Sequence, residues 1–582
     1  MLAFAPSFGI CSTSTLPPRP LSEVCTPTHI IQSVLPAANF LQGVEPIAAS
    51  VTANAVYNFT VNGGNTALST NNKSFCNVTF TYARTGRSDK VNLWFYLPSP
   101  SEFQNRFLAT GGGGLAVTSG ERALAGGLVY GAATGTTDGG FAGSWRRNNL
   151  GDVLLKADGT MDYDMLFAYG YTAIREMTVL GKEVTRRFYN GGDDGGGGGG
   201  DGDRFYSYFQ GCSEGGREGF SQIQRYGGVF DGVALGAPAF RQAFLQVAHL
   251  IPLVVENTLN YFPSPCELDK INVDTIGACD GLDGLVDGVV ARTDLCKLRH
   301  NASVSVGAPY SCPASAQSNR PAAQGAVTPE AVAVAETIWK GLVDSKGRQV
   351  YISNALSASF ADAATTYNPT TNKYEAVAGG LGLQYVNLFL KETRAPTLSL
   401  QNVTYDTLRS WILDGMRKFG DTLQTNWPDL EDYRTAGGKI VHWHGEADSA
   451  IPAASSLLYH EAVRKTMYPG LGYNESYSKL NEWYRLFMVP GAGHCSPNPQ
   501  QANGPFPLDV LGSVIDWVEK GVNPDRLNAT VQAGPEKGRQ QRLCSWPLRP
   551  LWKEDAVLEC VYHQESIDSW LPKLDGIPVP VY

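Results

Sequence analysis

The sequence predicts an α/β protein in which a mainly parallel β-sheet is covered by helices on both faces. Apolar, strand-like runs recur along the chain, and each leads into a glycine-rich or acidic loop: NRFLAT, RFYSYFQG, VALGAP, KIVHWHG and RLFMVPG. Helical stretches such as EGGREGFSQIQRY separate them. Strands that alternate with helices form parallel sheets, because each crossover helix packs against a face of the sheet.

The 582 residues are long enough for one large domain and an insertion. Between about 241 and 435 the cysteines cluster, proline and Ala/Ser-rich stretches appear, and strand-like runs become rare. We therefore predict a main domain built from 1–240 and 436–582, with 241–435 inserted over the sheet as a lid domain. Residues 1–20 lack a basic start and a proper apolar core, so they make a poor signal peptide, either leader or disordered. The run 193–203, rich in glycine and aspartate, predicts a flexible surface loop.

The net charge and the cysteine content limit which partners and which cellular compartment the protein is expected to have. The formal net charge of −9 and pI near 5.5 argue against nucleic acid or an anionic membrane as partner. No stretch approaches the roughly 18 apolar residues of a transmembrane helix. Eleven cysteines, together with seven glycosylation sequons, favour an oxidising secretory route, and we expect a secreted protein. The sequons begin at Asn58, Asn72, Asn77, Asn301, Asn402, Asn474 and Asn528.

The pentapeptide Gly211-Cys212-Ser213-Glu214-Gly215 matches the Gly-x-Ser-x-Gly pattern of a nucleophile elbow. In that pattern the serine occupies a strained turn between a strand and a helix, and side chains at the glycine positions would clash. Here a strand-like run precedes the motif and a helical stretch follows it. A serine in a merely structural turn is the alternative, but the context favours a nucleophile.

A nucleophilic serine needs a base, and the base needs an orienting carboxylate. In this kind of fold they follow the serine in the order acid, then histidine. His494 lies in the glycine loop after the last strand-like run, and Asp448 lies just beyond KIVHWHG, with Glu446 as a rival acid. His442 and His444 fall within that strand, where satisfied core histidines are expected. The set Ser213, Asp448 and His494 predicts an α/β-hydrolase fold, and the segment 241–435 adds the large inserted lid to this prediction.

Two backbone N–H groups are needed to hold the oxyanion of such a reaction. We expect one from Glu214, the residue after the nucleophile. We expect the other from the glycine run 111–114 after an early strand, through Gly112 and Gly113, because amides without side chains can approach a carbonyl closely. A plain flexible turn is the alternative for that run.

Two cysteines adjoin the proposed nucleophile and base. Cys212 precedes Ser213, and Cys495 follows His494. If serine and histidine are within hydrogen-bonding reach, these neighbours can come within the roughly 4.4–6.8 Å Cα separation of a disulfide. The bond would clamp nucleophile to base. A nucleophilic Cys212 is the alternative, although Ser213 occupies the apex of the elbow.

This combination resembles the fungal tannase and feruloyl esterase family over nearly the whole chain. The likeness includes CNVTFTY, GCSEGGREG, GAPAF, CELDKI, HGEADSAIPAASS, LCSWPLRPLW and SIDSW. It implies the same three catalytic residues and the Cys212–Cys495 disulfide, whereas Glu214 departs from the family, where Asp or Thr is common.

The resemblance also implies a function. It implies a secreted serine esterase acting on the galloyl ester and depside bonds of tannins and on small gallates. The alternative within the family is a feruloyl esterase that releases hydroxycinnamic acids from plant cell walls. A serine carboxypeptidase shares the fold and residue order, and a non-catalytic binding protein of the same fold is a more distant alternative.

The remaining cysteines are expected to form four further disulfides. Cys279–Cys296 and Cys544–Cys560 bracket short segments, and Cys266–Cys312 remains by elimination within the lid. We also expect Cys25–Cys76, which leaves Cys11 odd.

An acidic loop between two of these cysteines predicts a metal site. In CDGLDGLVDGVV, three aspartates are spaced at offsets 0, 3 and 7, and their carboxylates repel one another unless a hard cation bridges them. The family resemblance implies a structural Ca²⁺ site in the lid. Its ligands would be the side chains of Asp280, Asp283 and Asp287 with the carbonyls of Leu285 and Val289. A solvated acidic turn is the alternative.

Overall fold

The computed structural model describes residues 19–63, 67–87, 89–141, 150–190, 205–315, 320–377, 380–394, 399–554 and 557–579. Residues 1–18, with Cys11, and the glycine and aspartate run 193–203 lie outside the described residues. No helix in the described ranges is long and apolar enough to cross a membrane.

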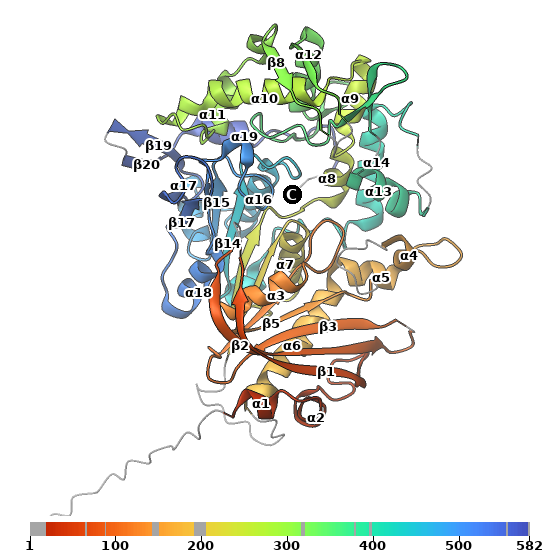
Figure 1. The fold of residues 1–582 in the computed structure, drawn as a ribbon, viewed down its shortest axis with the longest axis vertical. Coiled ribbons are helices and arrows are strands. Elements are labelled where there is room, and N and C mark those ends of the chain that lie inside the picture. The colour runs from red at the N-terminus through yellow and green to blue at the C-terminus, as the bar shows by residue number, and fades with distance from the viewer. Residues whose placement is uncertain are drawn as a thin grey trace, which may run out of the picture.

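A nine-stranded sheet forms the centre of the molecule, in the order β1-β2-β3-β5-β4-β6-β7-β14-β15 (Figure 1). From β5 to β15 all neighbours are parallel, whereas β1, β2 and β3 pair antiparallel at one edge. The strands are β1 (Val44–Val61), β2 (Thr70–Arg84), β3 (Val91–Pro98), β4 (Arg106–Thr110), β5 (Ala132–Thr137), β6 (Tyr206–Cys212), β7 (Gly232–Gly236), β14 (Lys439–Gly445) and β15 (Tyr484–Val489). The mostly parallel sheet is as predicted, and the five strand-like runs of the sequence are β4, β6, β7, β14 and β15.

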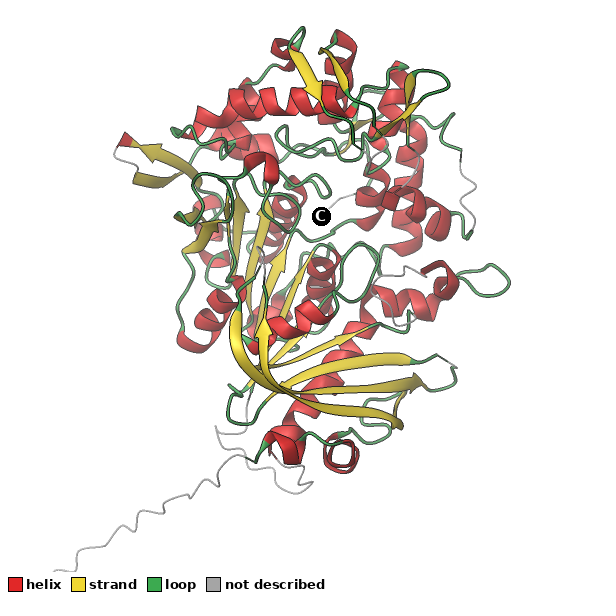
Figure 2. Cartoon of the chain, viewed as in Figure 1, coloured by secondary structure: helices red, strands yellow, loops and turns green. Residues whose placement is uncertain are grey.

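Helices cover both faces of this sheet (Figure 2). Successive residues of a strand point to opposite faces. Accordingly, Phe209 and Val233 pack in one apolar cluster with α6 and α7, whereas their neighbours Tyr208 and Ala234 pack in another with α18. The longer helices outside the segment between β7 and β14 are α3 (Glu121–Leu128), α6 (Ala173–Asn190), α7 (Glu214–Arg225), α16 (Ala454–Met467), α17 (Tyr473–Leu480), α18 (Val510–Lys520) and α19 (Gln564–Trp570).

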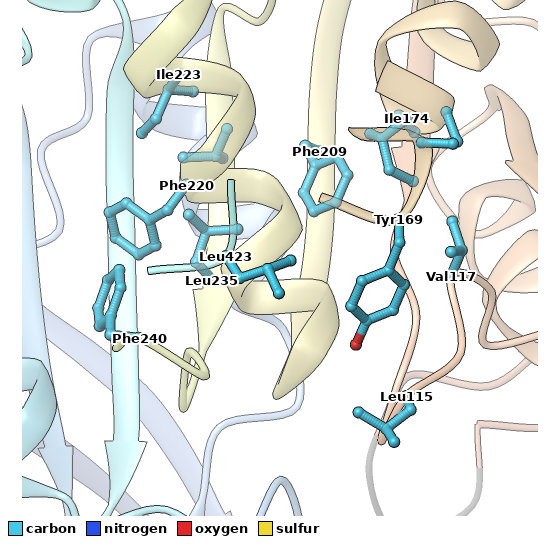
Figure 3. Close-up of a cluster of buried hydrophobic side chains, with 14 of the residues drawn as sticks. Leu115, Val117, Tyr169, Ile174, Phe209, Phe220, Ile223, Leu235, Phe240 and Leu423 are labelled. Atoms are coloured by element: carbon cyan, nitrogen blue, oxygen red, sulfur yellow. The ribbon is translucent and has the colours of Figure 1, made fainter. Parts of the chain in front are cut away.

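Helix α7 is held between apolar side chains from several elements, as Figure 3 shows. Phe220 on this helix contacts Phe240, with ring centroids 4.8 Å apart. Gly219 lies so close to the sheet that a Cβ there would come within 2.4 Å of Leu235. This tight packing fixes the N-terminus of α7 at the end of β6, where Ser213 lies.

Between β7 and β14 the chain forms helices and three two-stranded sheets, β8–β9, β10–β11 and β12–β13. This segment lies at the top of Figure 1, on the side where β7 and β14 end. Its longer helices are α8 (Gln242–Ala248), α9 (Ile251–Leu259), α10 (Pro265–Cys279), α11 (Thr293–Arg299), α12 (Pro329–Trp339), α13 (Gly380–Tyr385) and α14 (Tyr405–Phe419). Its strands are β8 (Pro309–Cys312), β9 (Ala323–Ala326), β10 (Leu342–Val343), β11 (Gln349–Tyr351), β12 (Thr365–Asn368) and β13 (Lys373–Ala376).

Five disulfides connect these parts, and all five pairings expected from the sequence are confirmed. They are Cys25–Cys76, Cys212–Cys495, Cys266–Cys312, Cys279–Cys296 and Cys544–Cys560. The last of these ties β18 (Gln540–Cys544) of a small sheet to β20 (Val557–Val561) of a hairpin near the C-terminus. The sheet also contains β16 (Pro505–Phe506) and β17 (Arg526–Val531), and the hairpin partner is β19 (Arg549–Lys553).

Candidate active site

Ser213 occupies a strained turn between β6 and α7, with φ 64° and ψ −123°. Non-glycine residues seldom adopt this conformation, and such strain persists only where the surroundings enforce it. The flanking glycines are required: a Cβ on Gly211 would lie 2.5 Å from the Gly215 carbonyl, and one on Gly215 would lie 2.8 Å from the Gly112 carbonyl oxygen. The elbow geometry expected from the pentapeptide is therefore present.

The structure brings Ser213, His494 and Asp448 together in one hydrogen-bonded chain. His494 Nε2 lies 2.9 Å from Ser213 Oγ, and His494 Nδ1 lies 2.7 Å from Asp448 Oδ2. Each residue follows the carboxyl end of a parallel strand, namely β6, β14 and β15. The arrangement allows His494 to accept the serine proton while Asp448 holds its other nitrogen.

The electrostatics of the three groups suit that proton transfer. Burial of the imidazole favours its neutral form, but the charge and hydrogen bond of Asp448 outweigh this and raise the pKa of His494 above its ordinary value. Burial likewise opposes ionisation of Asp448, yet His494 and His444 hold the pKa of this carboxyl well below its usual range. Asp448 is thus a carboxylate that stabilises protonated His494.

Glu446, the rival acid, has a different partner. Its carboxylate is fully buried and accepts a hydrogen bond from Arg549 at 2.7 Å. The Asp448 side chain turns back on its own loop, where Oδ1 accepts the amides of Ala450 and Ile451 at 2.8 and 2.9 Å. This local turn aims Oδ2 at His494.

His444 is a site residue that the sequence reasoning placed only in the core. Its Nε2 lies 3.1 Å from Asp448 Oδ2, so two histidines share one carboxylate oxygen. One signal could have revealed it: His444 is the penultimate residue of the strand whose following loop carries Asp448. At such a position a side chain can reach back to that loop.

The oxyanion donors agree only in part with the expectation. No acceptor is found for the Glu214 N–H within the described residues, which suits a first helical amide pointing toward a ligand. Gly112 and Gly113 differ from the prediction, because both N–H groups are already in use. Gly112 donates to Glu218 Oε2 at 2.7 Å, and Gly113 donates to the Ala116 carbonyl at 3.1 Å.

Glu218 was also missed by the sequence reasoning. It is fully buried on α7, one turn beyond Ser213, and burial together with the neighbouring charge of Glu214 raises its pKa well above the ordinary value. Its bond to Gly112, with that from the Gly215 N–H to the Gly112 carbonyl at 3.0 Å, fixes the glycine run against the elbow. One signal could have revealed Glu218. It is an ionisable residue in the glycine-rich first turns of α7, a helix expected to pack closely against its neighbours.

The Cys212–Cys495 disulfide joins the residue before the serine to the residue after the histidine, with Cα atoms 6.1 Å apart. Cys212 is therefore oxidised and does not serve as a nucleophile. The bond ties the end of β6 to the loop after β15, across 283 residues of sequence. It holds the nucleophile and the base in register across the sheet.

Replacing Cys212 and Cys495 with alanine together is expected to lower kcat by roughly a hundredfold, because a displacement of about 1 Å between reacting groups has that effect. Ester hydrolysis and the melting temperature are measured side by side. The matched control is the Cys544→Ala, Cys560→Ala pair, which removes a disulfide away from the serine. Equal activity losses in both variants would contradict a specific role for the clamp.

The acidic loop 280–289 folds around one carboxylate. Asp280 accepts the amides of Asp287, Gly288 and Val289 at 2.9–3.2 Å. Asp287 pairs with Arg539 at 2.6 Å, whereas burial and the neighbouring aspartates raise the pKa of Asp283 to about 7. Among the residues that the structure describes, no three acidic, histidine or cysteine side chains are gathered closely enough to hold a metal ion.

A strained serine at a strand–helix turn, hydrogen-bonded to a histidine and a buried aspartate at the carboxyl ends of parallel strands, defines the chain as a serine hydrolase of the α/β-hydrolase class. Comparisons with known proteins narrow this class. A family model described as tannase and feruloyl esterase matches residues 76–567. The chain belongs to this family and is a carboxylic ester hydrolase.

Individual relatives match over nearly the whole length. A tannase of Aspergillus oryzae is 42% identical over 586 aligned residues, with 96% of each chain covered. A probable feruloyl esterase of Arthroderma benhamiae is 31% identical, covering 82% of this chain and 83% of the relative. Among solved structures, the tannin acyl hydrolase from Aspergillus niger is 50% identical with a TM-score of 0.92, covering 97% of this chain and all of that one.

Proposed function

We propose that the chain hydrolyses esters by two-step acyl transfer at Ser213. His494 takes the proton of Ser213 Oγ as the oxygen attacks the ester carbonyl, and then gives it to the leaving alcohol. Water, deprotonated by His494, next attacks the acyl-serine and releases the acid. Asp448 stabilises the imidazolium in both steps. The observation that carries this proposal is the continuous hydrogen-bonded chain from Ser213 to Asp448.

The oxyanion is held, in this proposal, by the Glu214 amide at the positive end of α7. The second donor comes from the glycine run 111–114. Because Gly112 and Gly113 donate elsewhere, Gly114 takes their place: its N–H has no acceptor within the described ranges. Glu218 keeps this run in position.

We assign galloyl esters of tannins as the substrate class. Identities of 42% and 50% to tannin-hydrolysing relatives, against 31% to a probable feruloyl esterase, support this assignment. The segment 241–435 acts as a lid that shapes the acyl pocket, since it lies on the side where the catalytic strands end. Five disulfides support a secreted enzyme.

We expect the enzyme to hydrolyse methyl gallate with a kcat/KM at least tenfold higher than for methyl ferulate. The two acyl groups differ in hydroxyl pattern and in length, and a pocket built to pair buried hydroxyls discriminates strongly against analogues that lack them. Initial rates with both esters under identical conditions test this. A preference for methyl ferulate would assign the enzyme to the feruloyl branch instead.

We also propose a structural Ca²⁺ in the loop 280–289. Its donors would be the carboxylates of Asp280, Asp283 and Asp287 with the carbonyls of Leu285 and Val289. The donor chemistry fits, because the loop offers oxygen ligands and Arg539 pairs with Asp287 alone, whereas no cation of the described residues pairs with Asp280 or Asp283. The three carboxylates are not gathered in the structure, so they would have to draw together around the ion. Bound there, Ca²⁺ would neutralise buried charge and stabilise the loop, and it would take no part in the acyl transfer.

Chelation with excess EDTA is expected to lower the melting temperature by several degrees while fresh samples keep their rate at low temperature. A ligand at a hundred times its Kd stabilises the folded state by about 2.7 kcal/mol. Asp283→Asn should reduce the EDTA effect, and Glu330→Gln, an exposed acidic position on α12, should leave it intact. Unchanged melting in EDTA with no calcium by elemental analysis would refute the site.

A further inference from the structure

Behind Asp448, a row of fully buried polar side chains leads away from the catalytic serine. His444 on β14 contacts Asp448, and its Nδ1 lies 2.7 Å from Ser456 Oγ on α16. The same Ser456 Oγ lies 2.8 Å from His442 Nε2, and His442 Nδ1 lies 2.8 Å from the Tyr484 hydroxyl on β15. Three elements, β14, α16 and β15, thus contribute to one uninterrupted line of hydrogen bonds.

The direction of each bond follows from the two ends of the row. His444 Nε2 faces Asp448 Oδ2 and, at 3.2 Å, the Ile451 carbonyl, which are both acceptors, so this nitrogen carries a proton. With His444 neutral, its Nδ1 accepts, and the Ser456 hydroxyl must donate to it. Ser456 Oγ then accepts from His442 Nε2–H, and His442 Nδ1 accepts from the Tyr484 hydroxyl.

The opposite direction is disfavoured on two counts. It would place a proton on both nitrogens of His444, a buried imidazolium sharing one carboxylate oxygen with His494. It would also turn the Tyr484 hydroxyl into an acceptor, and the structure places no other acceptor for its proton among the described residues. Burial lowers the pKa of His442 well below its ordinary value, which agrees with a neutral ring in the row.

The consequence is a fully occupied carboxylate. Asp448 Oδ1 accepts two backbone amides, and Oδ2 accepts His444 and His494. A carboxylate has about four acceptor sites. We propose that His444 is a positioning residue that locks the Asp448 carboxylate for His494, and that Ser456, His442 and Tyr484 hold His444 in its donating tautomer.

This inference rests on the proposed function of the serine, and two variants test it. Gln at position 444 can donate through its amide nitrogen and accept from Ser456 through its oxygen, whereas Phe can do neither. We expect His444→Gln to keep kcat within about threefold, and His444→Phe to lose roughly a hundredfold in kcat. KM should stay unchanged in both, because His444 lies behind Asp448.

The assay uses p-nitrophenyl acetate and, separately, the rate of Ser213 labelling by phenylmethylsulfonyl fluoride. Both measurements report the reactivity of Ser213 and do not depend on the assignment of gallate esters as substrate. An inactive wild-type enzyme would contradict the proposed function rather than this inference. His460→Phe is the control for lost packing and should keep near wild-type kcat. His460 is equally buried on α16 and packs on the Tyr484 ring at 4.6 Å between centroids, but its ring nitrogens make no hydrogen bond within the described residues. A folded His444→Phe with near wild-type kcat, or a folded His444→Gln as impaired as Phe, would overturn the proposal.

Discussion

Ser213→Ala is expected to reduce the rate of ester hydrolysis by several orders of magnitude while leaving the fold and substrate binding intact. The elbow places Ser213 Oγ 2.9 Å from His494 Nε2, and no other group in the described site can form the acyl intermediate in its place. Loss of a triad nucleophile leaves only the oxyanion donors and substrate binding, a residual of roughly 10³–10⁴ over water. Steady-state rates with methyl gallate measure the loss.

Ser221→Ala is the matched control for that variant. Ser221 lies on the same helix, is fully buried, and donates to the Glu218 carbonyl at 2.7 Å. It should keep nearly full activity, and circular dichroism should show both variants folded. A Ser213→Ala enzyme that retained a tenth of the wild-type rate would remove Ser213 from the mechanism.

Asp448→Asn is expected to lower kcat by roughly 10⁴-fold, the loss known for the equivalent change in a serine protease triad. The amide cannot stabilise the imidazolium, and its NH₂ group favours the wrong tautomer of His494. Since the carboxylate now raises the pKa of His494, its loss should also move the acidic limb of kcat/KM to lower pH. The full pH profile of kcat/KM records both effects.

Glu446→Gln provides the contrast. This carboxyl pairs with Arg549, so the variant should lose stability rather than rate per folded molecule. Active-site titration normalises the rates to folded enzyme. If Glu446→Gln lowered kcat as strongly as Asp448→Asn, the acid would have been assigned to the wrong residue.

Local patterns explain why so much of the site could be read from the sequence. Three local motifs each predict a catalytic residue at the end of a strand: the Gly-x-Ser-x-Gly turn, the loop after KIVHWHG and the glycine loop around His494. Parallel strands deliver their carboxyl ends to one edge, so three separate motifs meet there. The same adjacency made the Cys212–Cys495 pairing predictable.

What the sequence did not reveal depends on contacts between distant segments. The antiparallel strands β1 and β2 carry polar residues on an exposed face, so the hydrophobic pattern is weak in them. Gly112 and Gly113 are taken by Glu218 and Ala116, and a glycine run carries no sign of which amide remains free. His444 reaches Asp448 only because a loop folds back by four residues.

The position of the clamp along the chain has a consequence for the producing cell. Ser213 and His494 are 281 residues apart, so at roughly 5–20 residues per second the ribosome completes the base about 15–60 s after the nucleophile. Throughout that interval the nascent chain holds a serine without a base. The disulfide between Cys212 and Cys495 then clamps the pair, and on the secretory route proposed above this oxidation would take place in the secretory compartment. With the proposed secretion, the order of synthesis and the late oxidation together would delay the fully active esterase until the chain has left the cytosol.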